Sequence, residues 1–185
     1  RDRLRSRGLG DVYKRQLLDQ LLVTKPLTHR NEGENLDLSG EQPVLSGSFN
    51  PGNGWQERKF DQPVTGRYVC LEALSAQDGK DLACIAEMYL LDENGERLSR
   101  EPWIVNYADS EDVSHVNCSA DKIFDLQEST YWSTTKDTPY PHSVVIDLGS
   151  TRTLTGIQYL PRMESEVPGG IKDFKVYVKS RAFNY

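Results

Sequence analysis

Two segments in which apolar and polar side chains alternate place the strongest constraint on the fold. In the segment 144–148, Val144, Ile146 and Leu148 fall on one face, with Val145 and Asp147 between them. The segment 174–179 repeats the pattern, with a lysine at each end of its polar face. Successive side chains of a β-strand point to opposite faces, so a two-residue period predicts half-buried strands. We therefore expect a sheet with one apolar face.

Other short apolar runs end at turns rich in Gly, Asn, Asp and Pro. The runs span 44–49, 55–60, 66–74, 84–91 and 153–160, and the turns span 50–54, 61–63, 77–80 and 92–95. Gly156 interrupts one run, which indicates a bulge or a close backbone contact. No amphipathic helix of ten or more residues is expected. Short strands at this spacing predict an all-β fold, an antiparallel β-sandwich.

The N-terminal end has a different composition. Residues 11–16 (Asp-Val-Tyr-Lys-Arg-Gln) can be back-translated into a transposon-end sequencing adaptor, so residues 1–16 are interpreted as a translated adaptor. A natural basic arm is the alternative. Six basic and few apolar side chains predict disorder in either case. Residues 17–43 are interpreted as a linker or residual segment, and the chain as a fragment cut at both ends.

Net charge and motifs disfavour several functional classes. The chain has a formal net charge of −6. Residues 1–16 carry a net charge of +4, so residues 17–185 carry −10. An acidic body repels phosphates and anionic polysaccharides, which disfavours nucleic-acid and heparin-type partners. No apolar run is long enough to predict a membrane span. The three histidines lack metal-ligand spacing, and no nucleophile elbow or phosphate-binding glycine loop occurs, so catalysis is not expected.

The three cysteines, Cys70, Cys84 and Cys118, form an odd set without metal-ligand spacing. Cys70 and Cys84 lie in neighbouring strand-like runs and could form a disulfide in an oxidising compartment. Free, buried thiols are the preferred interpretation, because a small apolar side chain suits these positions equally well.

A longer motif begins with Phe-Asp-Leu-Gln-Glu-Ser-Thr-Tyr-Trp at 124–132. It continues through Asp-Leu-Gly at 147–149 and Tyr-Leu-Pro-Arg at 159–162. This order resembles the first half of a coagulation-factor-five/eight type C domain, also called discoidin-like, of the galactose-binding-like superfamily. Residues 67–71 and 85–89 resemble the two closing strands of the same family. The resemblance implies a jelly-roll sandwich that binds ligands on its loops.

In this chain the closing strands come first. The simplest interpretation makes residues 44–96 the C-terminal half of one module and residues 97–185 the N-terminal half of a second. The alternative is a single permuted sandwich that both segments complete, which is physically allowed where termini lie close together.

The resemblance also implies a structural calcium ion in the acidic loop. By motif match, Asp125 and Thr130 supply side-chain ligands and Lys122 and Gln127 supply carbonyls. Glu87 matches the glutamate of the closing strand. Leu126 stands where the family usually has Gly, which matters if the backbone there needs a positive φ.

Carbohydrate-binding relatives present an aromatic residue, a His and an Arg on loops at one end of the sandwich. By that resemblance Tyr140, His142, Arg162 and Glu164 are candidate sugar contacts, and Trp55 is a candidate aromatic contact in the first half. Trp132 is expected in the core rather than at a ligand.

The expected function is a non-catalytic carbohydrate-binding module of a multi-domain bacterial glycan-degrading enzyme, located outside the cell, in the periplasm or at the cell surface. The expected partners are a glycan containing galactose or N-acetylhexosamine and the catalytic domain of the same polypeptide. A sandwich that packs against that domain without binding sugar is the alternative.

Overall fold

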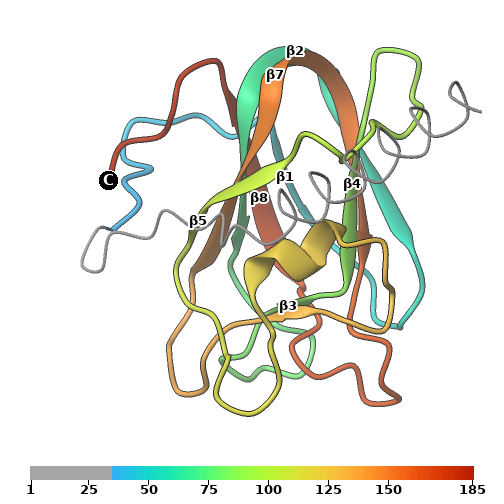
Figure 1. Cartoon of the computed structure of the whole chain (residues 1–185), viewed down its shortest axis with the longest axis vertical. Helices are drawn as coiled ribbons and strands as arrows, with labels where there is room; N and C mark the ends of the chain where they lie inside the picture. The colour runs from blue at the N-terminus through green and yellow to red at the C-terminus, as the bar shows by residue number, and fades with distance from the viewer. Residues whose placement is uncertain (1–34) are drawn as a thin grey trace, which may run out of the picture.

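The computed structural model describes residues 35–185. The predictions for residues 1–16 and for residues 17–34 of the expected linker lie outside the described residues. Eight strands and one short 3₁₀ helix make up the described part (Figure 1). They are β1 (Leu45–Ser48), β2 (Gln56–Ala73), β3 (Cys84–Ile85), β4 (Glu87–Leu91), β5 (Ile104–Ala108), η1 (Ala120–Phe124), β6 (Trp132–Ser133), β7 (His142–Leu160) and β8 (Asp173–Lys179). The all-β prediction is confirmed.

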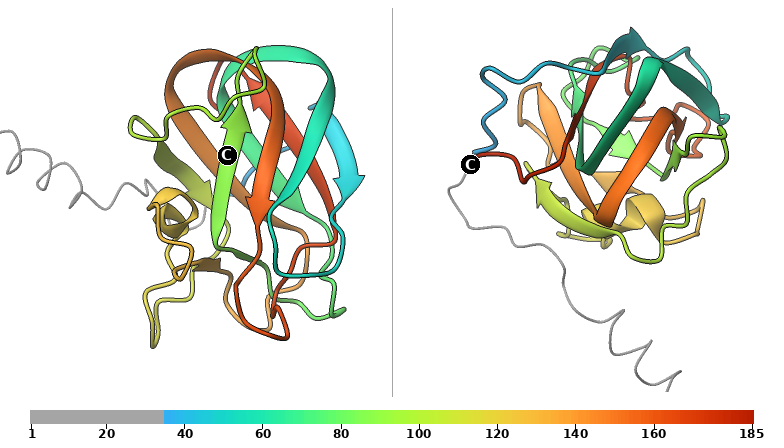
Figure 2. Two further views of the ribbon diagram at one scale, coloured as in Figure 1. Left: turned by 90° about the vertical axis from the view of Figure 1, so that its right-hand side faces the viewer. Right: turned by 90° about the horizontal axis from the view of Figure 1, so that it is seen from above.

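Two long strands turn a single hydrogen-bonded sheet into two layers. The first part of β2 pairs with the end of β7, from Gln56 opposite Tyr159 onward, and β4 continues that layer. The last part of β2 pairs with the start of β7 and with β8, and β5 and β1 complete the second layer. Register shifts lie between the two parts of β2, where both strands arch over the top of the molecule (Figures 1 and 2). Such irregularities let strands bend between layers.

Each long strand combines two strands that the sequence pattern separates. The predicted strands 55–60 and 66–74 are joined in β2, and 144–148 and 153–160 are joined in β7. The residues between them, of which 61–63 were expected to be a turn, form the arch, which is mostly exposed. β2 and β7 pair through this arch at Thr65 and Thr153, whose hydroxyls lie 3.0 Å apart.

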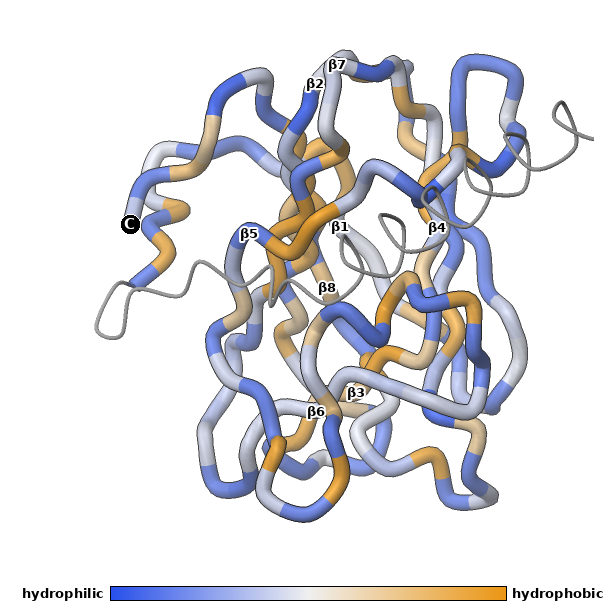
Figure 3. Tube along the Cα trace, viewed as in Figure 1, coloured by the Kyte–Doolittle hydropathy of each residue, from blue (hydrophilic) through white to orange (hydrophobic). Residues whose placement is uncertain are grey.

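The main core fills the space between the layers. Its largest fully buried side chains include Trp132, Tyr159 and Phe174. η1 and the small β3–β6 sheet close one side of this core, while the loops are mostly hydrophilic (Figure 3). Trp132 is 1% exposed and its indole nitrogen donates to the Ser110 carbonyl at 3.0 Å, so its predicted core position is confirmed.

The outer face of the second layer is also covered, contrary to the half-buried prediction for the segment 144–148. Val145 and Cys70 on this face are fully buried. A second apolar cluster forms here, because Leu36 and Leu38 from one end of the described chain and Phe183 from the other pack over the strands. An isolated bridge between Asp37 and Asn184 joins the two ends.

Gly156 lies where the first layer meets the arch. A Cβ at this position would meet the Arg58 carbonyl oxygen at 2.8 Å and the Lys59 Cα at 3.3 Å. The close backbone contact expected from the sequence is therefore present, and only glycine allows it.

The segments 44–96 and 97–185 contribute alternating strands to the same sheet, in the order β1-β8-β2-β7-β4. In this structure the two segments thus share one core. How they are distributed over modules of the parent protein stays a prediction. The three cysteines are free and buried.

Candidate functional site

The acidic loop at 125–131 leaves η1 and carries the first group of predicted ligands. The Asp125 carboxylate accepts hydrogen bonds from the Gln127 amide at 2.9 Å and from the Thr130 hydroxyl at 2.7 Å. The Thr130 hydroxyl also lies 2.9 Å from the Gln127 carbonyl oxygen. Leu126 adopts a φ of 66° at the turn, the left-handed conformation that favours glycine. Asp125, Gln127 and Thr130 are therefore brought together as expected.

Glu87 of β4 lies beneath this loop and pairs with a buried arginine. Glu87 and Arg100 are 1% and 6% exposed, and Arg100 Nη1 donates to Glu87 Oε2. Arg100 also donates to the Met88 carbonyl oxygen at 3.1 Å and the Tyr89 hydroxyl at 2.7 Å. Burial raises the pKa of Glu87, and the charge of Asp125 adds to the rise, while Arg100 opposes it. Glu87 is thus close enough to the loop to sense the charge of Asp125.

The oxygen atoms at this place suit calcium in type, but the charges are already balanced. Calcium takes six to eight hard oxygen ligands, carboxylates among them. Arg100 already binds the Glu87 carboxylate, and Lys122 Nζ lies 3.8 Å from Asp125 Oδ2. No group of three His, Cys, Asp or Glu side chains in residues 35–185 is arranged as metal ligands. Paired in this way with Arg100 and Lys122, the two carboxylates do not fit a calcium ion, so we expect no calcium binding, in contrast to the ligand set predicted from the sequence.

Three side chains at the ends of β6 and β7 form a second group, which we call the rim site: Tyr131, Arg162 and Glu164. The Arg162 guanidinium stacks over the Tyr131 ring at 4.2 Å and donates to the Glu164 carboxylate. Among the described residues the buried Arg162 Nε has no hydrogen-bond partner. The Glu164 side chain is 53% exposed and that of Arg162 is 20% exposed. An aromatic ring, a guanidinium and a carboxylate therefore meet at the surface.

His142 and Tyr140 are held by the protein itself. His142 is fully buried, and its ring nitrogens lie 2.7 Å from Asp109 Oδ2 and 2.6 Å from the Asp81 carbonyl oxygen. The half-buried Tyr140 packs edge-on against the His142 ring, and its hydroxyl donates to the Leu82 carbonyl at 2.8 Å. Burial, the largest cause, raises the pKa of the Tyr140 hydroxyl. Both side chains hydrogen-bond the backbone at Asp81 and Leu82. In this conformation neither His142 nitrogen is available to a ligand.

Trp55 belongs to a different cluster from Tyr140 and His142. Its ring lies 5.6 Å from that of Tyr89, and the Arg97 guanidinium packs over both rings, at 4.6 and 4.1 Å. The Trp55 indole nitrogen donates to Glu128 of the acidic loop at 3.1 Å. The five predicted sugar contacts are therefore divided among three places: Arg162 contacts Glu164, Tyr140 contacts His142, and Trp55 lies in a third cluster.

Several residues that the sequence did not single out complete these clusters. Tyr131 precedes the core residue Trp132, and Tyr89 lies between the buried Met88 and Leu90. The alternation of faces along a strand could have identified both as outward-facing aromatics. Arg97 and Arg100 follow a turn, and no local sequence signal marks either of them.

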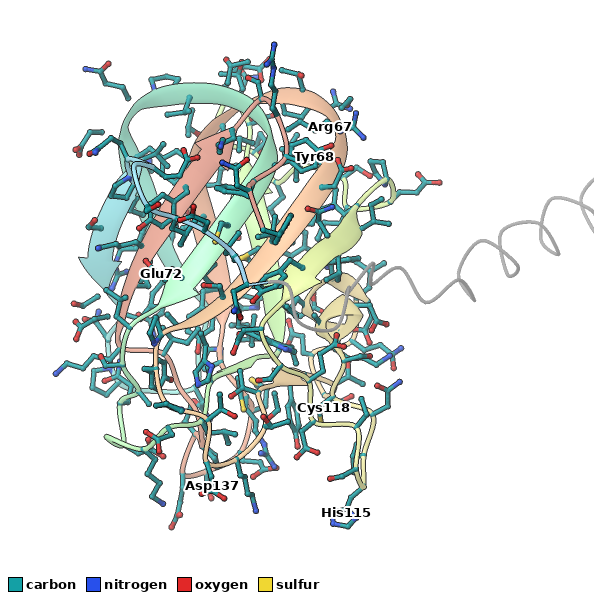
Figure 4. All side chains as sticks on the ribbon, turned by 90° about the vertical axis from the view of Figure 1, so that its left-hand side faces the viewer. Arg67, Tyr68, Glu72, His115, Cys118 and Asp137 are labelled. Carbon is teal, nitrogen blue, oxygen red and sulfur yellow. The ribbon has the colours of Figure 1, made fainter. Side chains whose placement is uncertain are left out.

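The loops at this end of the molecule, with His115 at the tip of one and Asp137 on another, extend beyond the strands (Figure 4). Among residues 35–185 no helix is long and apolar enough to cross a membrane.

The sequence profile of the F5/8 type C domain matches residues 106–185, which include the acidic loop, β7 and β8.

Residues 106–185 belong to the F5/8 type C domain family.

The chain is similar over part of its length to parts of two larger proteins. A sialidase of Micromonospora viridifaciens is 36% identical over 73 residues, which cover 37% of this chain and 11% of the sialidase. A galactose oxidase of Gibberella zeae is 28% identical over 91 residues, which cover 49% of this chain and 13% of the oxidase. The aligned part is thus a little over a tenth of the length of either relative.

Proposed function

We propose that the chain is a non-catalytic module that binds carbohydrate at the rim site and holds a linked catalytic domain near its glycan. F5/8 type C domains bind glycans generally, and the two relatives carry their similar segment as a small part of an enzyme. Linking a weak binding module to a catalytic domain raises the effective concentration of the glycan. On this proposal the parent protein acts outside the cell, in the periplasm or at the cell surface.

The contact between Arg162 and Tyr131 is the observation that carries the proposal. A sugar presents an apolar C–H face and a set of hydroxyls, so its sites combine an aromatic ring with a few fixed polar groups. Tyr131 supplies the ring, with the Arg162 guanidinium over one of its faces, and Arg162 and Glu164 supply a donor and an acceptor. Stacking on Tyr131 fixes the guanidinium before a ligand arrives, which reduces the entropy lost on binding.

Galactose- and N-acetylhexosamine-containing glycans are the proposed ligands. A single sugar has few atoms and buries little area, so we expect a Kd of roughly 0.1–1 mM. The test is a glycan array probed with the wild-type chain and with Arg162→Ala. Loss of binding in this variant, with an unchanged melting temperature, supports the proposal, and equal binding by both proteins refutes it.

One observation favours a protein-contact function instead. Val113 and Val116 are 61% and 66% exposed in the loop that carries His115, and Met163 beside the rim site is 47% exposed. Apolar side chains on loops at one end suit contact with a neighbouring domain. In that case the double variant Val113→Ser/Val116→Ser associates more weakly with the parent catalytic domain. Neither the wild type nor Arg162→Ala then binds a glycan.

A further inference from the structure

A second cluster, which we call the aromatic flank, consists of Trp55, Tyr89 and Arg97. Tyr89 pairs with Gln158 on β7, four residues before Arg162 of the rim site. Trp55 directly precedes Gln56, which pairs with Tyr159. The aromatic flank thus lies beside the strand end from which the rim site begins.

The acidic loop connects the two clusters. Glu128 accepts the Trp55 indole hydrogen bond, and Tyr131, three residues later, carries the stacked Arg162. A ligand that lies along this loop therefore meets aromatic side chains on both sides of it.

Hydrogen bonds hold the flank arginine in place. Arg97 Nε donates to Gln158 Oε1 at 2.7 Å, and Gln158 Nε2 donates to Glu57 Oε2 at 2.7 Å. Arg97 is exposed, and its Nη groups have no hydrogen-bond partner within the described part of the chain. The guanidinium packs over two rings and keeps free Nη donors. It can therefore bind hydroxyl oxygens with little further loss of side-chain entropy.

The local charges select a neutral ligand. Arg97 is accompanied by the exposed carboxylates of Glu57 and Glu128, and residues 17–185 carry a formal charge of −10. An anionic sugar such as a uronic acid would be repelled by this surface. A neutral sugar can accept from Arg97, donate to a carboxylate and pack its C–H face on Trp55, because Arg97 and Arg100 both lie over the Tyr89 ring.

There is also space beside Trp55. Residues 51–54 are all exposed, and an added Cβ at Gly52 or Gly54 would meet no atom within 4 Å. The loop before Trp55 is therefore open around these glycines, and Trp55 itself is partly exposed.

We propose that the aromatic flank is a second saccharide subsite, specific for a neutral sugar, so that the module binds an oligosaccharide across the acidic loop and not a single terminal sugar. This inference rests on the proposed function of the rim site. It predicts that affinity grows with ligand length and that this growth depends on Trp55.

The test compares long and short ligands by titration. The long probes are lacto-N-tetraose and chitotetraose, and the short probes are methyl β-galactoside and methyl N-acetyl-β-glucosaminide. For the wild type we expect the better tetrasaccharide to bind about tenfold more tightly than its terminal glycoside. In Trp55→Ala the tetrasaccharide loses that advantage while the glycoside binds as before. Trp55→Phe keeps a ring and retains part of the advantage.

Tyr185→Ala serves as the matched control, because Tyr185 is an exposed aromatic that packs on Tyr107 and bonds Asn106 at the outer face. It should change neither affinity. The chain has three tryptophans, so its indole NMR resonances are few, and comparison with Trp55→Phe identifies that of Trp55. This resonance should shift with the tetrasaccharide and not with the short glycoside.

Two failures can be distinguished. If both ligands bind and Arg162→Ala abolishes binding, but Trp55→Ala leaves the length advantage intact, the second subsite is wrong and the rim site stands. If the wild type binds no long or short probe, the proposed function is wrong and the subsite fails with it.

Discussion

His142 Nδ1 lies 2.7 Å from Asp109 Oδ2, and the second ring nitrogen lies 2.6 Å from the Asp81 carbonyl oxygen. Both partners accept hydrogen bonds, so the imidazole satisfies both when each nitrogen carries a proton. Burial lowers the pKa of His142, but the hydrogen bond and charge of Asp109, with the Asp81 carbonyl, outweigh it and raise the pKa above its ordinary value near 6.5. Below this raised pKa the pair is an imidazolium–carboxylate contact inside the fold.

This pair gives the stability a defined pH dependence. Because the pKa of His142 is higher in the folded state, its contribution is fully present below the ordinary value and is lost as the pH rises through the folded value. His142→Gln cannot carry the charge. We expect the wild type to lose stability relative to this variant as the pH rises from about 6.5 through the raised pKa of folded His142, measured by urea denaturation. A constant difference across this range would contradict the assignment.

The buried pair of Glu87 and Arg100 should respond differently to single and double substitutions. Arg100→Gln leaves the Glu87 carboxylate buried without its cation, and we expect a loss of about 3–5 kcal/mol in the free energy of unfolding. The double variant Glu87→Gln/Arg100→Gln removes both charges and should recover most of this loss. Denaturant unfolding of the three proteins measures the coupling, and additive losses would show that the two charges are independent.

Calcium should not stabilise the wild-type chain. Arg100 and Lys122 already balance the carboxylates of Glu87 and Asp125, and a ligand that does not bind the folded state leaves its melting temperature unchanged. The comparison is a thermal melt in about 5 mM calcium and in excess chelator, a concentration sufficient for weak extracellular sites. A clear rise with calcium would restore the ligand set expected from the sequence.

Leu126 offers a stabilising substitution. Its φ of 66° is a strained backbone conformation for a residue with a Cβ. The side chain is 73% exposed, so its burial contributes little to stability. Leu126→Gly removes the Cβ conflict of about 1–2 kcal/mol and adds chain entropy to the unfolded state, for a net gain of roughly 0.5 kcal/mol. Leu126→Ala keeps the Cβ and should give no gain. If alanine stabilises as much as glycine, removal of the exposed apolar side chain is the cause and not the backbone.

The sequence predicted the strands and the core well, because both depend on local alternation and on apolar content. It identified Trp132 as a core residue and Gly156 as a close contact. It missed that 56–73 and 142–160 are continuous, since residues such as Pro63 and Gly149 indicate turns locally while pairing with the neighbouring strand carries the chain through the arch. The covered outer face escaped detection because Leu36, Leu38 and Phe183 come from distant parts of the chain.

The candidate site was predicted less completely, for a related reason. The comparison with carbohydrate-binding relatives indicated His142, Arg162 and Trp55 as candidate sugar contacts. The contacts of each side chain in the fold decide what it does. His142 is enclosed by Asp109 and Asp81, which are 33 and 61 residues away in the chain. Arg97 became visible only through the two rings that its guanidinium contacts.

The most direct test of the account is a calorimetric titration of the wild-type chain and of Arg162→Ala with lacto-N-tetraose and chitotetraose. We expect saturable binding of at least one tetrasaccharide by the wild type and a loss of more than about tenfold in affinity in the variant, whose melting temperature is unchanged. No binding by the wild type, or equal affinity of both proteins, would contradict a glycan-binding site built on Arg162 and Tyr131.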